Sequence, residues 1–157
     1  MTSSWSVEVE TKAPPVPLFK ATFNDWNNLG PKLLPDIIAS VTVLSGHGAA
    51  GSTRRINYTP AVPYEFVTER LEAIDHEKLE LWVSLVEGGD IGTKLESANS
   101  HIKVEGKGDG SVVKLEATQK VLPGKDVSEE IEKVKQGFIR SIKAVEEYLL
   151  ANPGSYA

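Results

Sequence analysis

The chain has 157 residues, of which 40% are hydrophobic and 25% are charged, and its formal net charge is −5. This length suits one domain with a single core, and the composition is typical of a soluble globular protein. The negative charge disfavours non-specific binding to nucleic acid or to an anionic membrane. The sequence contains no cysteine, which excludes disulfides and thiolate metal sites.

The first residues contain neither a basic n-region nor an apolar h-region, so no signal peptide is expected. No apolar run approaches the length of a membrane span. We therefore expect one cytoplasmic domain over residues 1–157, acting as a monomer without a membrane partner.

The N-terminal part of the chain predicts one strand and two short helices. Trp5, Val7 and Val9 alternate with polar residues, a pattern typical of a half-buried strand. The prolines that follow end the strand and suit the first turn of a helix. The first short helix is expected to begin at these prolines, with Leu18, Phe19, Ala21 and Phe23 as its apolar residues, and the second to cover residues 27–34.

Six further strands are predicted in the middle of the chain by β-branched runs and by alternating apolar residues. The clearest case has Leu79, Leu81, Val83 and Leu85 at every second position. Short turns separate the runs, so the strands are expected to pair in chain order as an antiparallel meander. The predicted strands cover residues 37–44, 52–58, 64–74, 79–86, 94–104 and 112–121.

The last long segment, residues 126–150, predicts the helix on which the strands close. Apolar residues recur there at steps of three and four, which places them on one stripe of a helix: Ile131, Val134, Phe138, Ile142, Val145 and Leu149. Asp126 and Glu129 have the spacing of a capping box, with Ser128 as an alternative N-cap. Asn152-Pro153-Gly154 should end the helix. The expected fold is α+β, with a curved antiparallel sheet wrapped around this helix.

The order of elements and several local motifs resemble the plant pathogenesis-related class-ten family, which has the fold of the birch major pollen allergen. The motifs that carry the resemblance are Leu18-Phe19-Lys20-Ala21, Asn28-Leu29-Gly30-Pro31-Lys32, the glycine loop 46–51, Asp75-His76, residues 87–92 and residues 144–151. The resemblance covers the full length and is greatest to monocot members. It implies a START-like, helix-grip fold with a seven-stranded sheet and an internal hydrophobic cavity. It also implies binding of amphiphilic small molecules such as flavonoids, cytokinins, sterols and fatty acids.

The candidate binding residues are those expected to face the interior, together with residues of the loops that flank an entrance. They are Ile38, Ile56, Tyr58, Tyr64, Phe66, Leu81, Val83, Leu85, Gly89, Ile91, Ser100, Ile102, Leu115, Gln119, Phe138, Ile139 and Ile142. Ser100, Gln119 and Thr68 share the inward parity of apolar neighbours, which suits a wet pocket better than a dry core. An ordinary solid core is the alternative interpretation, because periodicity alone does not exclude it.

The glycine loop, with Gly46, Gly48 and Gly51, could form an anion-binding nest of backbone N–H groups. It lies between two strands, and no Lys-Ser or Lys-Thr follows it, so it is not a nucleotide P-loop. Ala49 and Ala50 stand where the family has glycines, and non-glycine residues disfavour a positive φ. We therefore interpret the loop as a structural turn.

The resemblance places Arg54, Glu96, Glu146 and Tyr148 at positions proposed for ribonuclease action. Two carboxylates could share acid and base roles. The alternative is an ion-pair network that ties the glycine loop to the helix end. The net negative charge and the scattered histidines argue against RNA as a substrate, so we expect ribonuclease activity to be weak or absent.

No cofactor and no metal site are expected, because metal-ligand spacing is absent. His101 is predicted at the surface. Lys114 and Lys120 are predicted to point to solvent, which weakens a Schiff-base mechanism. The favoured function is a small-molecule carrier or sensor in plant defence or stress. The alternatives are an enzyme, either a ribonuclease or a biosynthetic enzyme, and a phosphatase regulator like the abscisic-acid receptors, whose gate sequence is missing.

Overall fold

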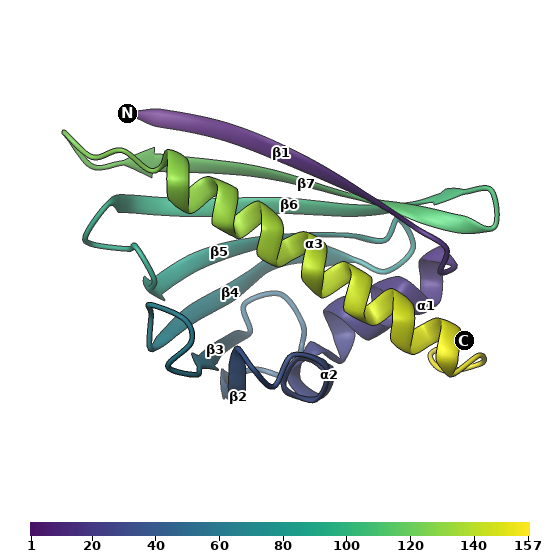
Figure 1. Cartoon of the computed structure of the whole chain (residues 1–157). Helices are drawn as coiled ribbons and strands as arrows, with labels where there is room; N and C mark the ends of the chain where they lie inside the picture. Colours follow the sequence, from purple (N-terminus) through teal and green to yellow (C-terminus); the bar gives the residue numbers. More distant parts are fainter.

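The computed structural model describes residues 1–157 and shows one seven-stranded antiparallel sheet that curves around a long C-terminal helix (Figure 1). The strand order is β1-β7-β6-β5-β4-β3-β2. The strands are β1 (Thr2–Thr11), β2 (Ile38–Ser45), β3 (Thr53–Tyr58), β4 (Phe66–Asp75), β5 (Glu80–Gly88), β6 (Leu95–Lys107) and β7 (Gly110–Val121). The helices are α1 (Pro15–Phe19), the π-helical turn η1 (Lys20–Asn24), α2 (Trp26–Leu33) and α3 (Ser128–Ala151). The predicted α+β helix-grip fold is confirmed.

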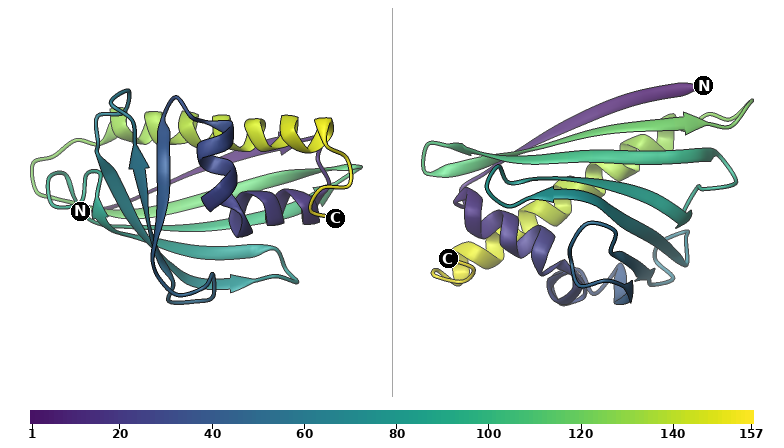
Figure 2. Two further views of the ribbon diagram at one scale, coloured as in Figure 1. Left: turned by 90° about the horizontal axis from the view of Figure 1, so that it is seen from below. Right: turned by 180° about the vertical axis from the view of Figure 1, so that it is seen from behind.

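The first two strands of the chain form the two opposite edges of the sheet. β1 returns to pair with β7, from Thr2 opposite Lys120 to Thr11 opposite Ser111. β2 pairs only with β3, so α1, η1 and α2 connect one edge to the other. Figure 2 shows these helices and α3 on the same side of the sheet, where they close its concave face.

The first helical segment begins at the prolines, as predicted. Pro15 lies in the first turn of α1, where its missing N–H costs no hydrogen bond. The segment continues directly into η1 and buries Leu18, Phe19 and Ala21 almost completely. The helix start predicted at the prolines is therefore confirmed.

The helix α3 is packed along its C-terminal half and uncovered along its N-terminal half. Ile142, Val145 and Leu149 belong to the main core, with at most 6% of their surface exposed. Val134 lies on the same stripe but is 52% exposed. The apolar stripe predicted from the sequence is therefore real, and only part of it is covered by protein side chains.

The start of α3 differs from both predicted caps. The helix begins at Ser128 and its N-cap is Val127, which makes no side-chain capping bond. Asp126 Oδ1 instead accepts hydrogen bonds from the backbone N–H and the hydroxyl of Ser128, at 2.9 and 2.6 Å. Charge-assisted bonds of this kind hold the pKa of Asp126 below its usual value. The capping box with Glu129 is not formed. The predicted stop after Ala151 is confirmed.

The strand β4 faces the opposite way to the prediction. Ile56 lies opposite Val67 and Arg54 opposite Glu69, so Val67 and Glu69 point inward. Phe66 lies on the outer face, where the Arg55 guanidinium stands 4.1 Å from the centre of its ring. The inward parity assigned to Phe66 and Thr68 was therefore wrong. Tyr64 lies before the strand, in the β3–β4 loop.

No helix of the structure is both long enough and apolar enough to span a bilayer.

On the outer face of the sheet, Lys114 pairs with Glu105 at 2.9 Å and Lys120 with Glu96 at 3.0 Å, so both lysines point to solvent as predicted. His101 also lies there, stacked on Trp82 with ring centres 4.5 Å apart.

Candidate ligand-binding site

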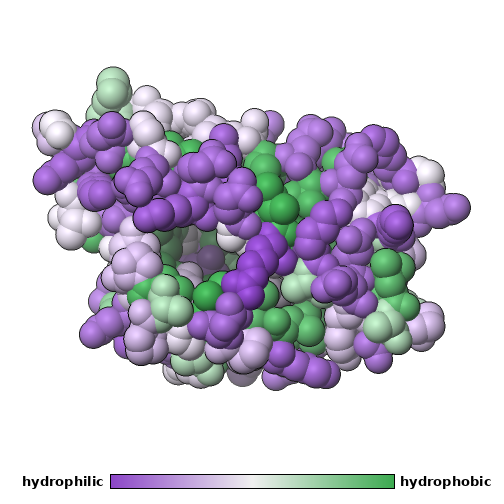
Figure 3. Space-filling view, in the orientation of Figure 1, coloured by the Kyte–Doolittle hydropathy of each residue, from purple (hydrophilic) through white to green (hydrophobic).

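A cavity of about 700 Å³ lies between the sheet and the N-terminal half of α3. Val83 and Leu85 of β5 line it from one side, and Ile131, Val134 and Gly137 of α3 line it from the other. Figure 3 shows a hollow in this face of the molecule, with hydrophobic residues in and around it and hydrophilic side chains at its rim. The volume and the mixed lining are those of a small-molecule site.

The cavity lies at this end of the sheet because small and polar side chains of β6 and β7 form the middle of its floor. Two rows cross β5, β6, β7 and β1: Val83, Ser100, Ala117 and Trp5, then Leu85, Ala98, Gln119 and Ser3. Farther along β6 and β7 the inward residues are large and buried, namely Ile102, Val104, Val113 and Leu115. Side-chain size increases in the same way along α3, from Gly137 to Ile142. Large side chains therefore fill one end of the interior, and the other end stays open.

Eight of the candidate binding residues line a cavity. Seven line this one: Tyr58, Tyr64, Val83, Leu85, Gly89, Ser100 and Gln119. Leu81, together with Val83, lines a second cavity nearby. Burial raises the pKa of Tyr58 to about 12, with a smaller contribution from the charge of Glu69. Tyr58 therefore presents a neutral phenol to the interior.

The other nine candidates lie outside both cavities. Ile38, Ile56, Ile102, Leu115 and Ile142 are buried in the main core, and Phe138 and Ile139 pack against it. Phe66 lies on the outer face, and Ile91 packs against a small cluster of Leu95, Val121 and Val127. Apart from Phe66 and Ile91, these residues belong to the packed part of the interior.

Several lining residues were not among the candidates. Trp5 is the clearest case, because its alternation with Val7 and Val9 already indicated an inward side chain. Val134 also lines the cavity, and it lies on the predicted apolar stripe of the helix. Lys94 and Glu130 also line the cavity. Nothing in the sequence indicated this, because charged residues in a loop and at a helix start are usually solvated.

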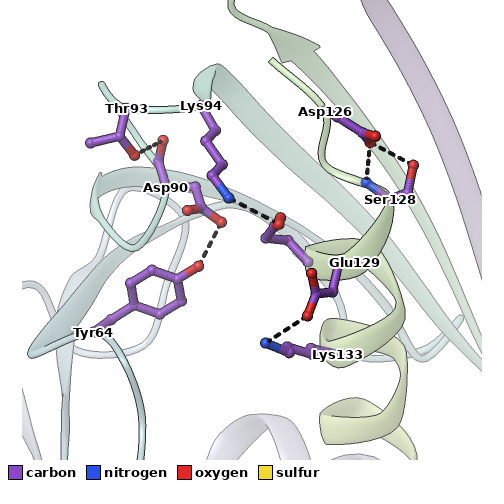
Figure 4. Close-up of polar contacts among 9 residues, drawn as sticks. Tyr64, Asp90, Thr93, Lys94, Asp126, Ser128, Glu129 and Lys133 are labelled. Atoms are coloured by element: carbon purple, nitrogen blue, oxygen red, sulfur yellow. Dashed lines mark hydrogen bonds and ion pairs between the residues drawn. The ribbon is translucent and has the colours of Figure 1, made fainter.

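Two polar contacts join the loops at the mouth of this cavity to each other and to α3 (Figure 4). The Tyr64 hydroxyl donates to Asp90 Oδ2 at 2.7 Å, which connects the β3–β4 loop to the β5–β6 loop. Burial, helped by this bond, raises the pKa of Tyr64. Lys94 Nζ donates to Glu130 Oε1 at 3.0 Å, and this bond raises the pKa of Lys94. We expect a ligand to enter between these loops and α3, past these two contacts.

Replacing Lys94 with methionine is expected to speed ligand entry and release without a large change in affinity. A partly exposed ion pair contributes about 0–1 kcal/mol, so rates should rise by up to about fivefold. Stopped-flow fluorescence would measure both rates. The matched control is Lys133→Met, whose partner Glu129 lies 3.5 Å away on the same helix and joins no loop. Equal effects of both substitutions would contradict a gating role for Lys94.

The second cavity, of about 830 Å³, lies beside the glycine loop and has a more polar lining. It includes Asn24, Asn27, His47 and His76, and it shares Val83 and Glu69 with the first cavity. The two cavities are therefore neighbouring parts of one interior.

The glycine loop is held by its own hydrogen bonds. Gly46, Gly48 and Gly51 have φ values of 79°, 92° and 92°, which only glycine adopts readily. The Gly48 N–H donates to Ser52 Oγ at 3.0 Å, and the Gly51 N–H donates to the Leu71 carbonyl at 2.7 Å. These amides are already used within the protein, which supports the interpretation of a structural turn.

The four ribonuclease candidates have separate partners, and no hydrogen bond or ion pair joins any two of them. Arg54 bonds Glu69 at 3.0 Å and Asn27 at 2.9 Å. Glu96 pairs with Lys120, and the Lys32 ammonium lies over the Tyr148 ring. Glu146 accepts from the backbone N–H of Lys12 at 2.5 Å. The alternative network between the glycine loop and the helix end is not formed either.

We expect repurified protein to cleave RNA no faster than buffer does, because these side chains do not meet at one site. The measurement is cleavage of single-stranded RNA by the wild type, by Glu96→Gln and by Glu146→Gln. Robust cleavage that both substitutions abolish would overturn this expectation.

A curved antiparallel sheet closed over a cavity by one long helix defines the helix-grip class of ligand-binding folds. A model of the Pathogenesis-related protein Bet v 1 family matches residues 1–152 of this chain, and the protein belongs to that family. The resemblance seen in the sequence is thereby confirmed.

Among curated proteins, "Pathogenesis-related protein 1" of the monocot Asparagus officinalis is 46% identical over 155 residues, which cover 98% of this chain and 97% of the relative. Among solved structures, Ara h 8.0201 matches with a TM-score of 0.87 and 28% identity, over 97% of this chain and 100% of that chain. Norcoclaurine synthase from Thalictrum flavum, in complex with dopamine and hydroxybenzaldehyde, has a TM-score of 0.80 at 19% identity, over 98% and 90% of the two chains. The likeness to this enzyme shows the shared fold alone.

Proposed function

We propose that this protein is a cytoplasmic carrier or sensor that binds amphiphilic small molecules between the sheet and α3. One observation carries the proposal: the apolar stripe of α3 is half uncovered, and the uncovered half faces a cavity of about 700 Å³. Exposed apolar surface that lines a concave site is stabilised when a ligand covers it. The relative named "Pathogenesis-related protein 1" supports a role in plant defence or stress.

The lining favours ligands with a flat apolar body and few polar groups, such as flavonoids, cytokinins, sterols or fatty acids. Burying about 300 Å² of apolar ligand surface yields about 7 kcal/mol before the cost of association. The resulting affinity should be micromolar, as befits a carrier with modest selectivity. A bound ligand at a hundredfold excess over its Kd should stabilise the protein by about 2.7 kcal/mol.

Enzymatic action on a bound ligand is the alternative function. The geometry supports the carrier better, because the four candidate catalytic residues each bond to different partners.

Calorimetry and melting shifts with a flavonoid, a cytokinin, a sterol and a fatty acid test the proposal. We expect at least one of the four to bind with micromolar affinity and to raise Tm. If none binds below millimolar concentration, the carrier function fails.

A further inference from the structure

Three side-chain atoms in the rows that form the floor of the cavity have no hydrogen-bond partner: Ser3 Oγ, which can donate or accept, and the nitrogens of Trp5 and Gln119, which can only donate. Gln119 is only 7% exposed, and its Nε2 makes no hydrogen bond. The indole Nε1 of Trp5 is likewise buried without a partner. Both residues line the 700 Å³ cavity. Buried polar groups are almost always paired in folded proteins, so two orphans in one cavity wall indicate a missing partner.

The sheet register brings these two side chains together. Trp5 on β1 lies opposite Ala117 on β7, and Gln119 is two residues farther along β7. They are therefore diagonal neighbours on the same inward face, a spacing that long and aromatic side chains can bridge. An indole N–H can only donate, so the group that satisfies Trp5 must be an acceptor.

We propose that Trp5 and Gln119 form a two-donor anchor that binds the carbonyl oxygen of a neutral ligand. A carbonyl oxygen has two lone pairs and accepts one bond from each donor. This anchor rests on the proposed carrier function and specifies which polar group of the ligand is recognised. The ligand's carbonyl lies against β1 and β7, and its apolar body lies under α3.

The charges around the cavity favour a neutral carbonyl over a carboxylate. Four acidic side chains line the cavity, Glu69, Asp90, Glu129 and Glu130, against the two lysines Lys94 and Lys133. Both lysines are already paired, with Glu130 and Glu129. Lys135 Nζ lies 5.8 Å from the centre of the Trp5 ring, but Lys135 is not part of the lining. An anionic ligand would thus enter a net negative site without a free cation.

A pair of matched probes isolates the anchor. Flavanone and flavan share one ring skeleton and differ in the C4 carbonyl, so the ratio of their Kd values measures what the carbonyl contributes. Trp5→Phe removes the indole donor and Gln119→Met removes the amide at similar volume. Trp82→Phe is the control, because Trp82 lies on the outer face against His101. Thermal unfolding of each variant verifies that it is folded.

For the wild type and for Trp82→Phe, we expect flavanone to bind about tenfold more tightly than flavan. In Trp5→Phe and in Gln119→Met the ratio should fall to about threefold or less, while the Kd of flavan changes little. An unchanged ratio in both variants would overturn the anchor and leave the carrier function standing. Tighter binding of flavan-4-carboxylate than of flavanone would overturn the neutral carbonyl. If neither probe binds the wild type while other ligands do, the anchor alone fails; if no ligand binds, the carrier function fails with it.

Discussion

Replacing Ile142 with alanine is expected to lower the free energy of unfolding by about 2–5 kcal/mol. Ile142 is fully buried in the main core, where α3 packs most tightly. The substitution removes apolar contacts and leaves a hole that the surrounding side chains fill only in part. Denaturant unfolding would show the loss as a lower midpoint at an unchanged m-value.

The same helix offers an internal control with one identical substitution at two positions. Val145 is fully buried and Val134 is 52% exposed, although both lie on the apolar stripe. We expect Val145→Ala to be clearly destabilising and Val134→Ala to stay within about 0.5 kcal/mol of the wild type. Equal losses at the two positions would contradict a cavity under the N-terminal half of α3.

Replacing Gly137 with phenylalanine is expected to weaken ligand binding at least about tenfold, because the new ring fills the cavity. Gly137 lines the cavity, and a Cβ added there meets no atom within 4 Å. The helix therefore accepts a side chain at this position, and the ring projects toward space that the ligand would occupy. Titration calorimetry with flavanone measures the effect.

The control for this experiment is Gly137→Ala. Alanine favours the helix over glycine by about 0.5–1 kcal/mol, so this variant should be slightly more stable than the wild type. It should bind flavanone with nearly unchanged affinity. If Gly137→Phe folds and binds flavanone as well as Gly137→Ala does, the ligand occupies another part of the molecule.

Periodicity was sufficient to predict the order and nature of the elements. The alternation in residues 79–86 and the three-and-four spacing after residue 126 both reflect one buried face, and each gave the correct element to within a few residues. The cap of α3 was not predictable to the residue. Asp126, Ser128 and Glu129 can each accept or donate near a helix start, and their relative energies differ by about 1 kcal/mol or less.

The reversed strand β4 shows the limit of parity arguments. Phe66-Val67-Thr68 carries bulky residues on both parities, and the inward Glu69 looks like a solvent residue in sequence. Glu69 can point inward because Arg54, which is also inward, pairs with it at 3.0 Å. Such a pair depends on the tertiary structure, because the register of β3 and β4 brings the two side chains together.

The position of the cavity depends on how the volume of the inward side chains changes along each strand. The alternation of polar and apolar residues carries no information about that volume. Ser100 and Ile102 have the same parity, yet one lines the cavity and the other fills the core. Their cross-strand neighbours Ala117 and Leu115 repeat the difference. Between β6 and β7 the pairing places Ser100 beside Ala117 and Ile102 beside Leu115, and only the register reveals this.

An isotope-filtered NOE measurement on ¹³C-labelled protein with bound flavanone tests most directly whether the ligand binds under α3. We expect contacts from the flavanone rings to the methyl groups of Val83, Leu85 and Val134, which line the cavity from both sides. We expect none to Val113 or Ile142, which lie in the packed core. Contacts to outer-face methyl groups alone, or saturable binding with no contact to the cavity methyl groups, would contradict binding in this cavity.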